Sequence, residues 1–190
     1  LPLSDRYRFL EYHKWKYSGK VFLPLMNPTT VKRTPVLMAR VEGGIINSYN
    51  KYKRSPFGTY YMGGDMMSGS MGNYMNETIG LRGYKNGSIA GANYDYAYSY
   101  MKASLELRYP LIFEQSTTVW VLGFAEAGNA WSDISRYNPF DLKRSAGVGV
   151  RVMMPMIGLL GLDWGYGFDR PNGYNERGGS NIHFVLGRDL

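Results

Sequence analysis

The chain of 190 residues contains no cysteine, and it has no long apolar run. The absence of cysteine excludes a disulfide framework and a thiolate metal site, although it leaves the cellular compartment open. No stretch longer than about a dozen residues lacks a charged side chain, whereas a membrane-spanning helix needs about 20 apolar residues. The sequence therefore excludes a spanning helix. It does not exclude a membrane β-barrel, whose strands need only about 9–11 residues with one apolar face.

The beginning of the chain lacks the features of a protein start. It reads Leu1-Pro2-Leu3, with no initiator methionine, no apolar signal segment and no cleavage-site pattern. We expect the chain to be an excerpt of a longer precursor, so the missing signal peptide carries no information about secretion.

Residues that could carry catalysis or bind a metal are scarce. The chain has two histidines, and no His, Asp and Glu residues stand at the spacing of metal ligands, so we predict no metal and no cofactor. Ser180, Asn181 and His183 have the residue types of a nucleophile and its base but no supporting context, so we predict no catalytic residue. The Gly43-Gly44 and Gly63-Gly64 pairs indicate bulges or tight turns rather than a phosphate-binding loop.

The charge balance is basic, with 22 Lys and Arg against 15 Asp and Glu, alongside 17 tyrosines. This composition is compatible with nucleic-acid binding. The basic residues are spread along the chain, however, and no aromatic-basic recognition motif occurs. We therefore predict no nucleic-acid partner and expect basic residues in outer loops to contact anionic lipid headgroups.

Alternation of apolar and polar residues with a period of two is the main pattern in the chain. Over residues 101–113 every odd position is apolar or aromatic, while Lys102, Glu106 and Arg108 occupy even positions. Similar strands are predicted at residues 14–25, 37–45, 145–154, 160–168 and 181–187, with a weaker one at 57–63. Residues 118–131 are apolar on both faces except for Glu126, and we predict a strand there whose inner face is packed. We predict an all-β antiparallel chain of about eight strands without an amphipathic helix.

A soluble β-sandwich would give the same alternation, but three features favour an antiparallel transmembrane β-barrel. Aromatic residues such as Trp15, Tyr109 and Trp164 lie toward the strand ends, as in the girdles of membrane barrels. Charges occupy the centre of the opposite strand face, which a wet lumen tolerates, although a solvent-exposed face does too. Short connections (residues 154–157) alternate with long polar ones (residues 64–100), as in outer-membrane barrels.

The long segment at residues 64–100 is the most unusual part of the chain, because a connection of this length is usually functional or disordered. It contains the sequence Ile-Gly-Leu-Arg-Gly-Tyr at residues 79–84. If the segment folds into the lumen, Arg82 would meet Glu106 and Glu126, which occupy inward-facing positions of the two following strands. A bidentate contact between arginine and carboxylate would hold the loop in place.

Residues 79–84 resemble the [VIL]-R-G-[FY] motif in the sixth extracellular loop of the BamA superfamily of outer-membrane assembly proteins. Other segments resemble the strands of that family in order. These are residues 12–25 and 36–49 for strands nine and ten, 57–64 for the strand before the loop, 103–110 for the twelfth, 124–131 for the thirteenth, 144–169 for the next two, and 181–190 for the closing strand. The resemblance covers nearly the whole chain.

The resemblance implies a 16-stranded barrel of which residues 1–190 form the C-terminal half, strands nine to sixteen. The first half and the periplasmic POTRA repeats would lie outside this chain. It also implies an insertase, without a cofactor, that folds and inserts β-barrel proteins through a lateral gate in the outer membrane of a Gram-negative cell. Its partners would be unfolded outer-membrane β-barrel clients, accessory lipoproteins of an assembly complex and outer-membrane lipid. A translocation pore of the same superfamily, or a self-contained structural or adhesin barrel of eight strands, is the alternative, and an enzyme barrel is a more distant one.

The resemblance also assigns individual residues. Arg82, Gly83 and Tyr84 match the loop motif, and Glu106 and Glu126 match its acidic partners in the lumen. The lateral-gate strand would consist of Asn181, Ile182, His183, Phe184, Val185, Leu186, Gly187 and Arg188, with Gly187 providing a kink or weakened pairing. Two features depart from the family pattern. Residues 65–78 lengthen the approach to the motif, and the chain ends in Leu190 rather than in an aromatic residue.

Overall fold

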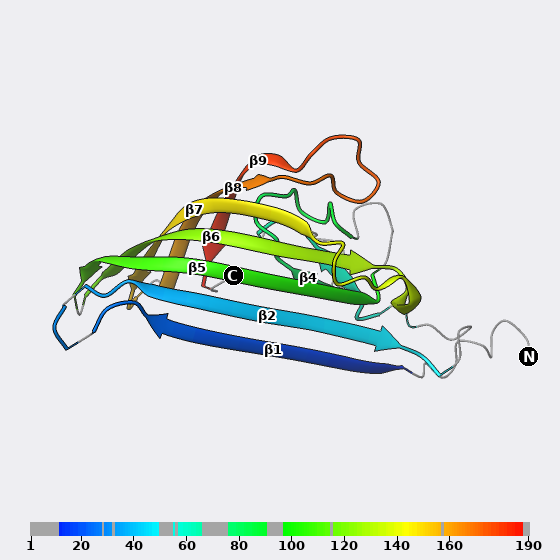
Figure 1. The fold of residues 1–190 in the computed structure, drawn as a ribbon, viewed down its shortest axis with the longest axis horizontal. Helices are drawn as coiled ribbons and strands as arrows, with labels where there is room; N and C mark the ends of the chain where they lie inside the picture. Colours follow the sequence, from blue (N-terminus) through cyan, green and yellow to red (C-terminus); the bar gives the residue numbers. More distant parts are fainter. Residues whose placement is uncertain are drawn as a thin grey trace, which may run out of the picture.

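The computed structural model describes residues 12–27, 29–31, 33–49, 55, 57–65, 76–90, 97–114, 116–156 and 158–187. Seven antiparallel strands form one sheet in the order β1-β2-β5-β6-β7-β8-β9 (Figure 1). Their bounds are β1 His13–Pro24, β2 Val36–Asn47, β5 Ser99–Phe113, β6 Thr118–Trp131, β7 Lys143–Met154, β8 Gly158–Gly167 and β9 Gly179–Leu186. The prediction of an all-β antiparallel chain is confirmed.

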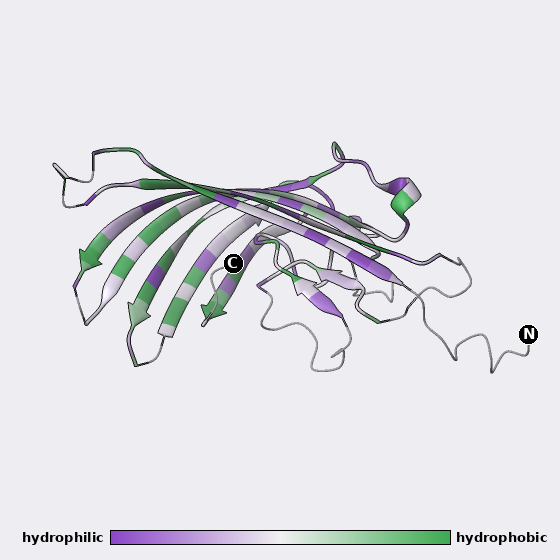
Figure 2. Ribbon diagram, turned by 90° about the horizontal axis from the view of Figure 1, so that it is seen from below, coloured by the Kyte–Doolittle hydropathy of each residue, from purple (hydrophilic) through white to green (hydrophobic). Residues whose placement is uncertain are grey.

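The period of two gives the sheet an apolar face and a polar face. On β5, Leu105 and Leu107 are each 47% exposed on one face, whereas Lys102 and Glu106 on the other face are almost fully buried. Successive side chains of a strand point to opposite faces, so this pattern follows directly from the alternation in the sequence. The sheet curves into an arch, and the short strands β3 and β4 lie beneath it (Figure 2). The concave face therefore carries the buried charges.

The connections differ between the two ends of the sheet. At one end they span residues 25–35, 114–117 and 155–157, and at the other end 48–98, 132–142 and 168–178. The 132–142 connection contains a short 3-10 helix, η2 (Ile134–Arg136). Within the described residues, no helix is long and apolar enough to cross a membrane.

The prediction of an eighth sheet strand at residues 57–63 is wrong. Only β3 (Tyr60–Met62) forms there, and it pairs in parallel with β4 (Glu77–Ile79) in a separate two-stranded sheet. Because β2 pairs directly with β5, the described part of the main sheet has seven strands, and residues 36–49 rather than 57–64 lead into the long connection. That connection begins at residue 48 rather than 64. We call residues 48–98 the loop.

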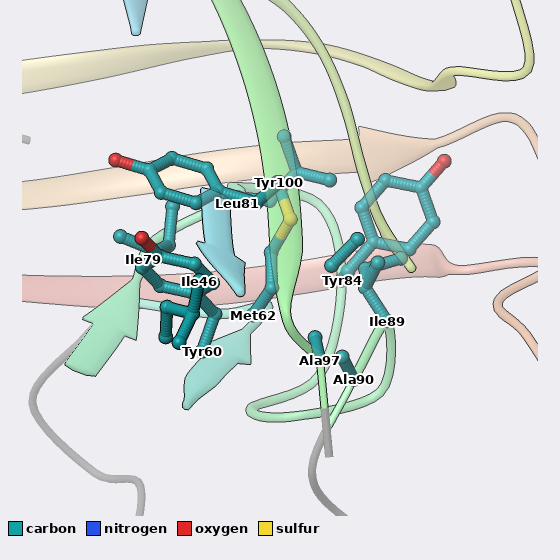
Figure 3. Close-up of a cluster of buried hydrophobic side chains, with 11 residues drawn as sticks. Ile46, Tyr60, Met62, Ile79, Leu81, Tyr84, Ile89, Ala90, Ala97 and Tyr100 are labelled. Carbon is teal, nitrogen blue, oxygen red and sulfur yellow. The ribbon is translucent and has the colours of Figure 1, made fainter. Parts of the chain in front are cut away.

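The loop packs around an apolar core, to which residues of β2, β5 and β6 also contribute. Tyr60 and Met62 are almost fully buried, and they pack against the inner wall of the sheet rather than facing outward. Tyr60 contacts Tyr100 of β5 edge-on at a centroid distance of 4.5 Å. Figure 3 shows this cluster, which comprises Ile46, Tyr60, Met62, Ile79, Leu81, Tyr84, Ile89, Ala90, Ala97, Tyr100 and Ala130.

The glycine pairs have different roles in the structure. β2 keeps its register through Gly43 and Gly44, so the bulge or turn predicted there is wrong. A Cβ on Gly44 would overlap the Tyr60 hydroxyl and lie 2.7 Å from the Tyr100 ring, so this glycine makes room for the loop core. In contrast, Gly63 and Gly64 have φ angles of +126° and +78°, as the predicted tight turn requires.

Candidate functional site

Arg82 lies at the tip of the loop, under the arch, with no exposed side-chain surface. Its Nε and Nη2 donate to Oε1 of Glu126 at 3.1 and 2.7 Å, and its backbone N–H donates to Oε2 of the same carboxylate at 2.9 Å. Nη2 also donates to Glu106 at 2.5 Å, and Nη1 to Asp163 at 3.3 Å. The guanidinium lies 3.8 Å from the centre of the Phe124 ring, within cation–π range. Arg82 therefore joins the loop to β5, β6 and β8.

The three carboxylates also bind a second cation each, from the wall of the sheet. Lys102 lies 3.2 Å from Glu126, Nη2 of Arg108 lies 2.7 Å from Glu106, and Arg151 holds Asp163 through two contacts of 2.5 and 2.7 Å. We call these seven charged residues the Arg82 cluster. Because the four cations exceed the three anions by one, the wall pairs remain balanced when Arg82 is removed. Burial lowers the pKa of Arg82, but the carboxylates, Glu126 first, outweigh this effect and raise its pKa above the ordinary value, so the residue stays charged.

Gly83 packs closely against a part of the inner sheet face that is formed mainly by glycines. Its φ angle is +85°, and a Cβ on it would lie 2.9 Å from Cβ of Ser145. On the wall, a Cβ on Gly165 would lie 2.8 Å from the backbone nitrogen of Gly83, and one on Gly167 would meet its carbonyl oxygen. Glycine is therefore needed on both sides of the contact for the loop backbone to approach β8.

Tyr84, the residue after Gly83, is held in place by hydrogen bonds of its hydroxyl. Its hydroxyl donates to the carbonyl of Arg144 at 2.7 Å and accepts from the backbone N–H of Asp169 at 3.3 Å. Burial raises the pKa of Tyr84 to about 12, so the hydroxyl remains a donor at neutral pH. This hydrogen-bonded side chain ties the loop tip to the outer ends of β7 and β8.

The loop tip also contacts the last strand of the sheet. The backbone N–H of Gly83 donates to Nε2 of His183 at 2.9 Å, and Nδ2 of Asn181 donates to the carbonyl of Gly83 at 3.0 Å. Asn181 further donates to the carbonyls of Gly178 and Gly179 at the start of β9. Both polar groups of the Gly83 backbone are thus satisfied by β9 side chains.

At the other side of the sheet, Glu77 of β4 joins the loop to β1. Its carboxylate pairs with Lys14 at 2.7 Å and with Lys16. Burial raises the pKa of Glu77, but the hydrogen bonds from the two lysines outweigh that effect and lower the pKa below its usual value. The loop is therefore bound to both lateral edges of the described sheet.

The structure brings together the loop motif and the two carboxylates that the alternation placed in the lumen, Glu106 and Glu126. The strand expected at 181–188 is shifted, because β9 begins at Gly179 and ends at Leu186. Its side chains Ile182, Phe184 and Leu186 point outward, while Asn181, His183 and Val185 point inward. Gly187 follows the strand with a φ angle of +70°, and Arg188 lies outside the described residues. The roles assigned to these residues stay predictions.

Sequence reasoning did not assign four members of the cluster, Lys102, Arg108, Arg151 and Asp163. All four occupy inward-facing positions, which the alternation identified, but whether they lie level with the loop tip depends on strand register. Cα pairing puts Gly149 opposite Asp163 and Gly161 opposite Arg151, so bare glycine positions surround this ion pair. Glycine opposite an inward charge is the sequence signal that could have found the pair.

No arrangement for hydrolysis emerges from Ser180 and His183. Ser180 faces outward, where its Oγ accepts from Nε1 of Trp164 at 2.8 Å, whereas His183 faces the lumen. Side chains on opposite faces of one strand cannot bring a hydroxyl and its base within hydrogen-bond reach. In the described part of the chain, no three His, Asp or Glu residues form a group that could hold a metal ion.

Residues 8–190 match the Omp85 superfamily domain. The chain belongs to the Omp85 superfamily. No curated protein matches it. Among solved structures, it is similar to the crystal structure of BamA from Haemophilus ducreyi lacking POTRA domains 1-3, with a TM-score of 0.61 and 21% sequence identity. The match covers 92% of this chain and 34% of the BamA chain.

These matches confirm the resemblance to the BamA superfamily that the loop motif indicated. The shared fold is that of an antiparallel transmembrane β-barrel, of which this Omp85 chain supplies a curved sheet. Its apolar convex face is the surface that such a barrel turns toward lipid. The Arg82 cluster and the loop then lie on the lumen side.

Proposed function

We propose that this chain is the C-terminal half of the barrel of an outer-membrane protein insertase. In this proposal, the first half of the barrel and the POTRA repeats belong to the same longer protein but lie outside residues 1–190. The barrel would fold and insert other β-barrel proteins in the outer membrane through a lateral gate, without catalysis or a cofactor. Its partners would be unfolded β-barrel clients, accessory lipoproteins and outer-membrane lipid.

The observation that carries this proposal is the position of the loop tip between the Arg82 cluster and β9. Arg82 is held by three buried carboxylates, and the next residue, Gly83, hydrogen-bonds β9. β9 pairs with β8 along one edge, and its other edge has no strand partner within the described residues. The loop tip thus contacts the strand whose edge a client would use.

The proposed mechanism depends on the cost of unpaired backbone groups in lipid. Each unsatisfied N–H or C=O costs several kcal/mol in the hydrocarbon region. An incoming client strand that pairs with the free edge of β9 satisfies these groups, a form of β-augmentation. Weak pairing of β9 with the first barrel strand would let the edge open, and the apolar convex face would pass the growing client into lipid.

The proposal can be tested with the whole protein reconstituted in liposomes. We expect it to accelerate the folding of an added outer-membrane β-barrel client without nucleotide or metal. Arg82→Ala should lower that acceleration, because the loop loses the contacts of the guanidinium with β5, β6 and β8. Arg136→Ala, which removes an exposed charge from η2, is the matched control and should leave the rate unchanged.

A translocation pore gives a different result in the same liposomes. It would move a soluble partner across the bilayer and leave the folding rate of the barrel client unaltered. Such an outcome would reject the insertase proposal while leaving superfamily membership intact.

A further inference from the structure

His183 makes an unusual contact with the loop, because a backbone N–H donates to its ring nitrogen. The N–H of Gly83 lies 2.9 Å from Nε2, and the imidazole is 4% exposed. A ring nitrogen can accept a hydrogen bond only when it carries no proton. The geometry therefore requires a neutral His183 with its single ring proton on Nδ1.

Asn181 completes the contact from the same face of β9. Its amide donates to the carbonyl of Gly83 at 3.0 Å, so one residue of the loop gives its donor and its acceptor to two inward side chains of the strand. Gly83 itself cannot shift toward the wall, because its backbone lies against Gly165 and Ser145. A movement of β9 away from the lumen must therefore break both hydrogen bonds.

We propose that His183 and Asn181 form a latch between the loop and the closing strand, and that the latch holds only while the His183 imidazole is neutral. Protonation adds a hydrogen at Nε2, which removes the acceptor and points a second donor at the Gly83 N–H. The strand then keeps its pairing with β8 but loses one of its two hydrogen bonds to Gly83, so that only the Asn181 amide still holds the loop. In this way the loop and the free edge of β9 are coupled through one titratable side chain.

The surroundings of His183 contain charges of both signs. Asp163 of β8 is its direct cross-strand partner, and Arg151 of β7 holds that aspartate. Glu126 of β6, Asp65 of the loop and Arg82 also act on the imidazole electrostatically. Both carboxylates of the Arg82 cluster in this group, Glu126 and Asp163, are already bound by cations.

The latch deepens the proposed function and rests on it only for its link to client assembly, so its test measures the contact itself. The 190 residues contain no cysteine, which allows a pair of spin labels at chosen positions. Lys85 on the loop is exposed, and Phe184 on β9 is 49% exposed on the outer face. The whole protein, labelled at these two positions, is measured by double electron–electron resonance at about pH 7.5 and about pH 5.

Four proteins separate the latch from a merely structural histidine: the natural sequence, two His183 variants and one control. The natural sequence should give a narrow distance distribution at the higher pH and a separated population that grows roughly fivefold at the lower pH, as expected for the loss of one hydrogen bond. His183→Gln keeps an acceptor but cannot take up a proton, so its distance distribution should be narrow at both pH values. The distance distribution of His183→Leu should be broad at both pH values. His13→Gln replaces the other histidine and should behave like the natural sequence.

The outcomes distinguish the latch from the function. An unchanged distribution in the natural sequence on acidification, or a His183→Gln protein that responds to pH as the natural one does, overturns the latch. If the distances change as expected while His183→Leu folds clients in liposomes at the natural rate, the latch stands and its proposed role in the insertase is rejected.

Discussion

Replacement of Arg82 by alanine should release the loop without unfolding the sheet. The side chain of Arg82 donates four hydrogen bonds to three buried carboxylates, and alanine retains only the backbone bond to Glu126. Breaking a buried ion pair usually costs about 3–5 kcal/mol, because a buried charge is left without a partner. Here every carboxylate retains a wall cation, namely Lys102, Arg108 or Arg151. We therefore expect a cost at the lower end of this range, about 3 kcal/mol. This cost should reduce the free energy of loop docking rather than that of sheet folding.

Trypsin cleavage after Lys85 provides the assay. This lysine is exposed, but the loop backbone around it is held in the docked state, so cleavage reports the fraction of molecules with an open loop. A loss of about 3 kcal/mol corresponds to a rise in that fraction of roughly 150-fold. The thermal transition of the barrel should change little. Cleavage within about threefold of the natural rate would refute the assignment of Arg82 as the main anchor of the loop.

Three further changes test other contacts of the loop. Gly165→Ala places a Cβ 2.8 Å from the nitrogen of Gly83 and should speed cleavage after Lys85, whereas Gly123→Ala, whose Cβ meets nothing within 4 Å, should not. Tyr84→Phe leaves the Arg144 carbonyl and the Asp169 N–H without the hydroxyl and should cost about 1–3 kcal/mol of docking in the same assay. Glu77 has a pKa below its usual value of 4.5, so its contribution is present at neutral pH and is lost as the pH falls through the lowered pKa. Glu77→Gln should increase hydrogen exchange in β1 at neutral pH and abolish the additional increase that the natural sequence shows below about pH 4.5.

Alternation predicted the strands of the main sheet well wherever one face is continuously apolar. Residues 101–113, which alternate throughout, lie within β5. Residues 118–131, predicted as a strand although both faces are apolar except at Glu126, coincide with β6. The weaker strand predicted at residues 57–63 forms only at Tyr60–Met62 and outside the main sheet, because Tyr60 and Met62 pack against the rest of the loop. They face the core of the loop, and a segment of three residues contains no information about which sheet it joins. Pairing partners of short strands are decided by tertiary packing, which a local pattern does not record.

The candidate site was predicted in part for a similar reason. Parity placed Glu106 and Glu126 in the lumen, and the structure puts both on Arg82. The same alternation placed Asp163 on the inner face, but its position level with the loop tip depends on the register of β7 with β8. The contact of His183 with Gly83 joins residues 100 positions apart and involves a backbone group, so no pattern of side chains could indicate it.

The most direct test of the account is cross-linking of a client to β9 during assembly. A cysteine at Phe184, 49% exposed on β9, is compared in the whole protein with one at Leu105, which is 47% exposed on the central strand β5. A client stalled during assembly carries a cysteine in its terminal strand. If β9 provides the edge that receives clients, the disulfide should form with Phe184→Cys and not with Leu105→Cys. Equal cross-linking at both positions, or at Leu105→Cys alone, would contradict the account.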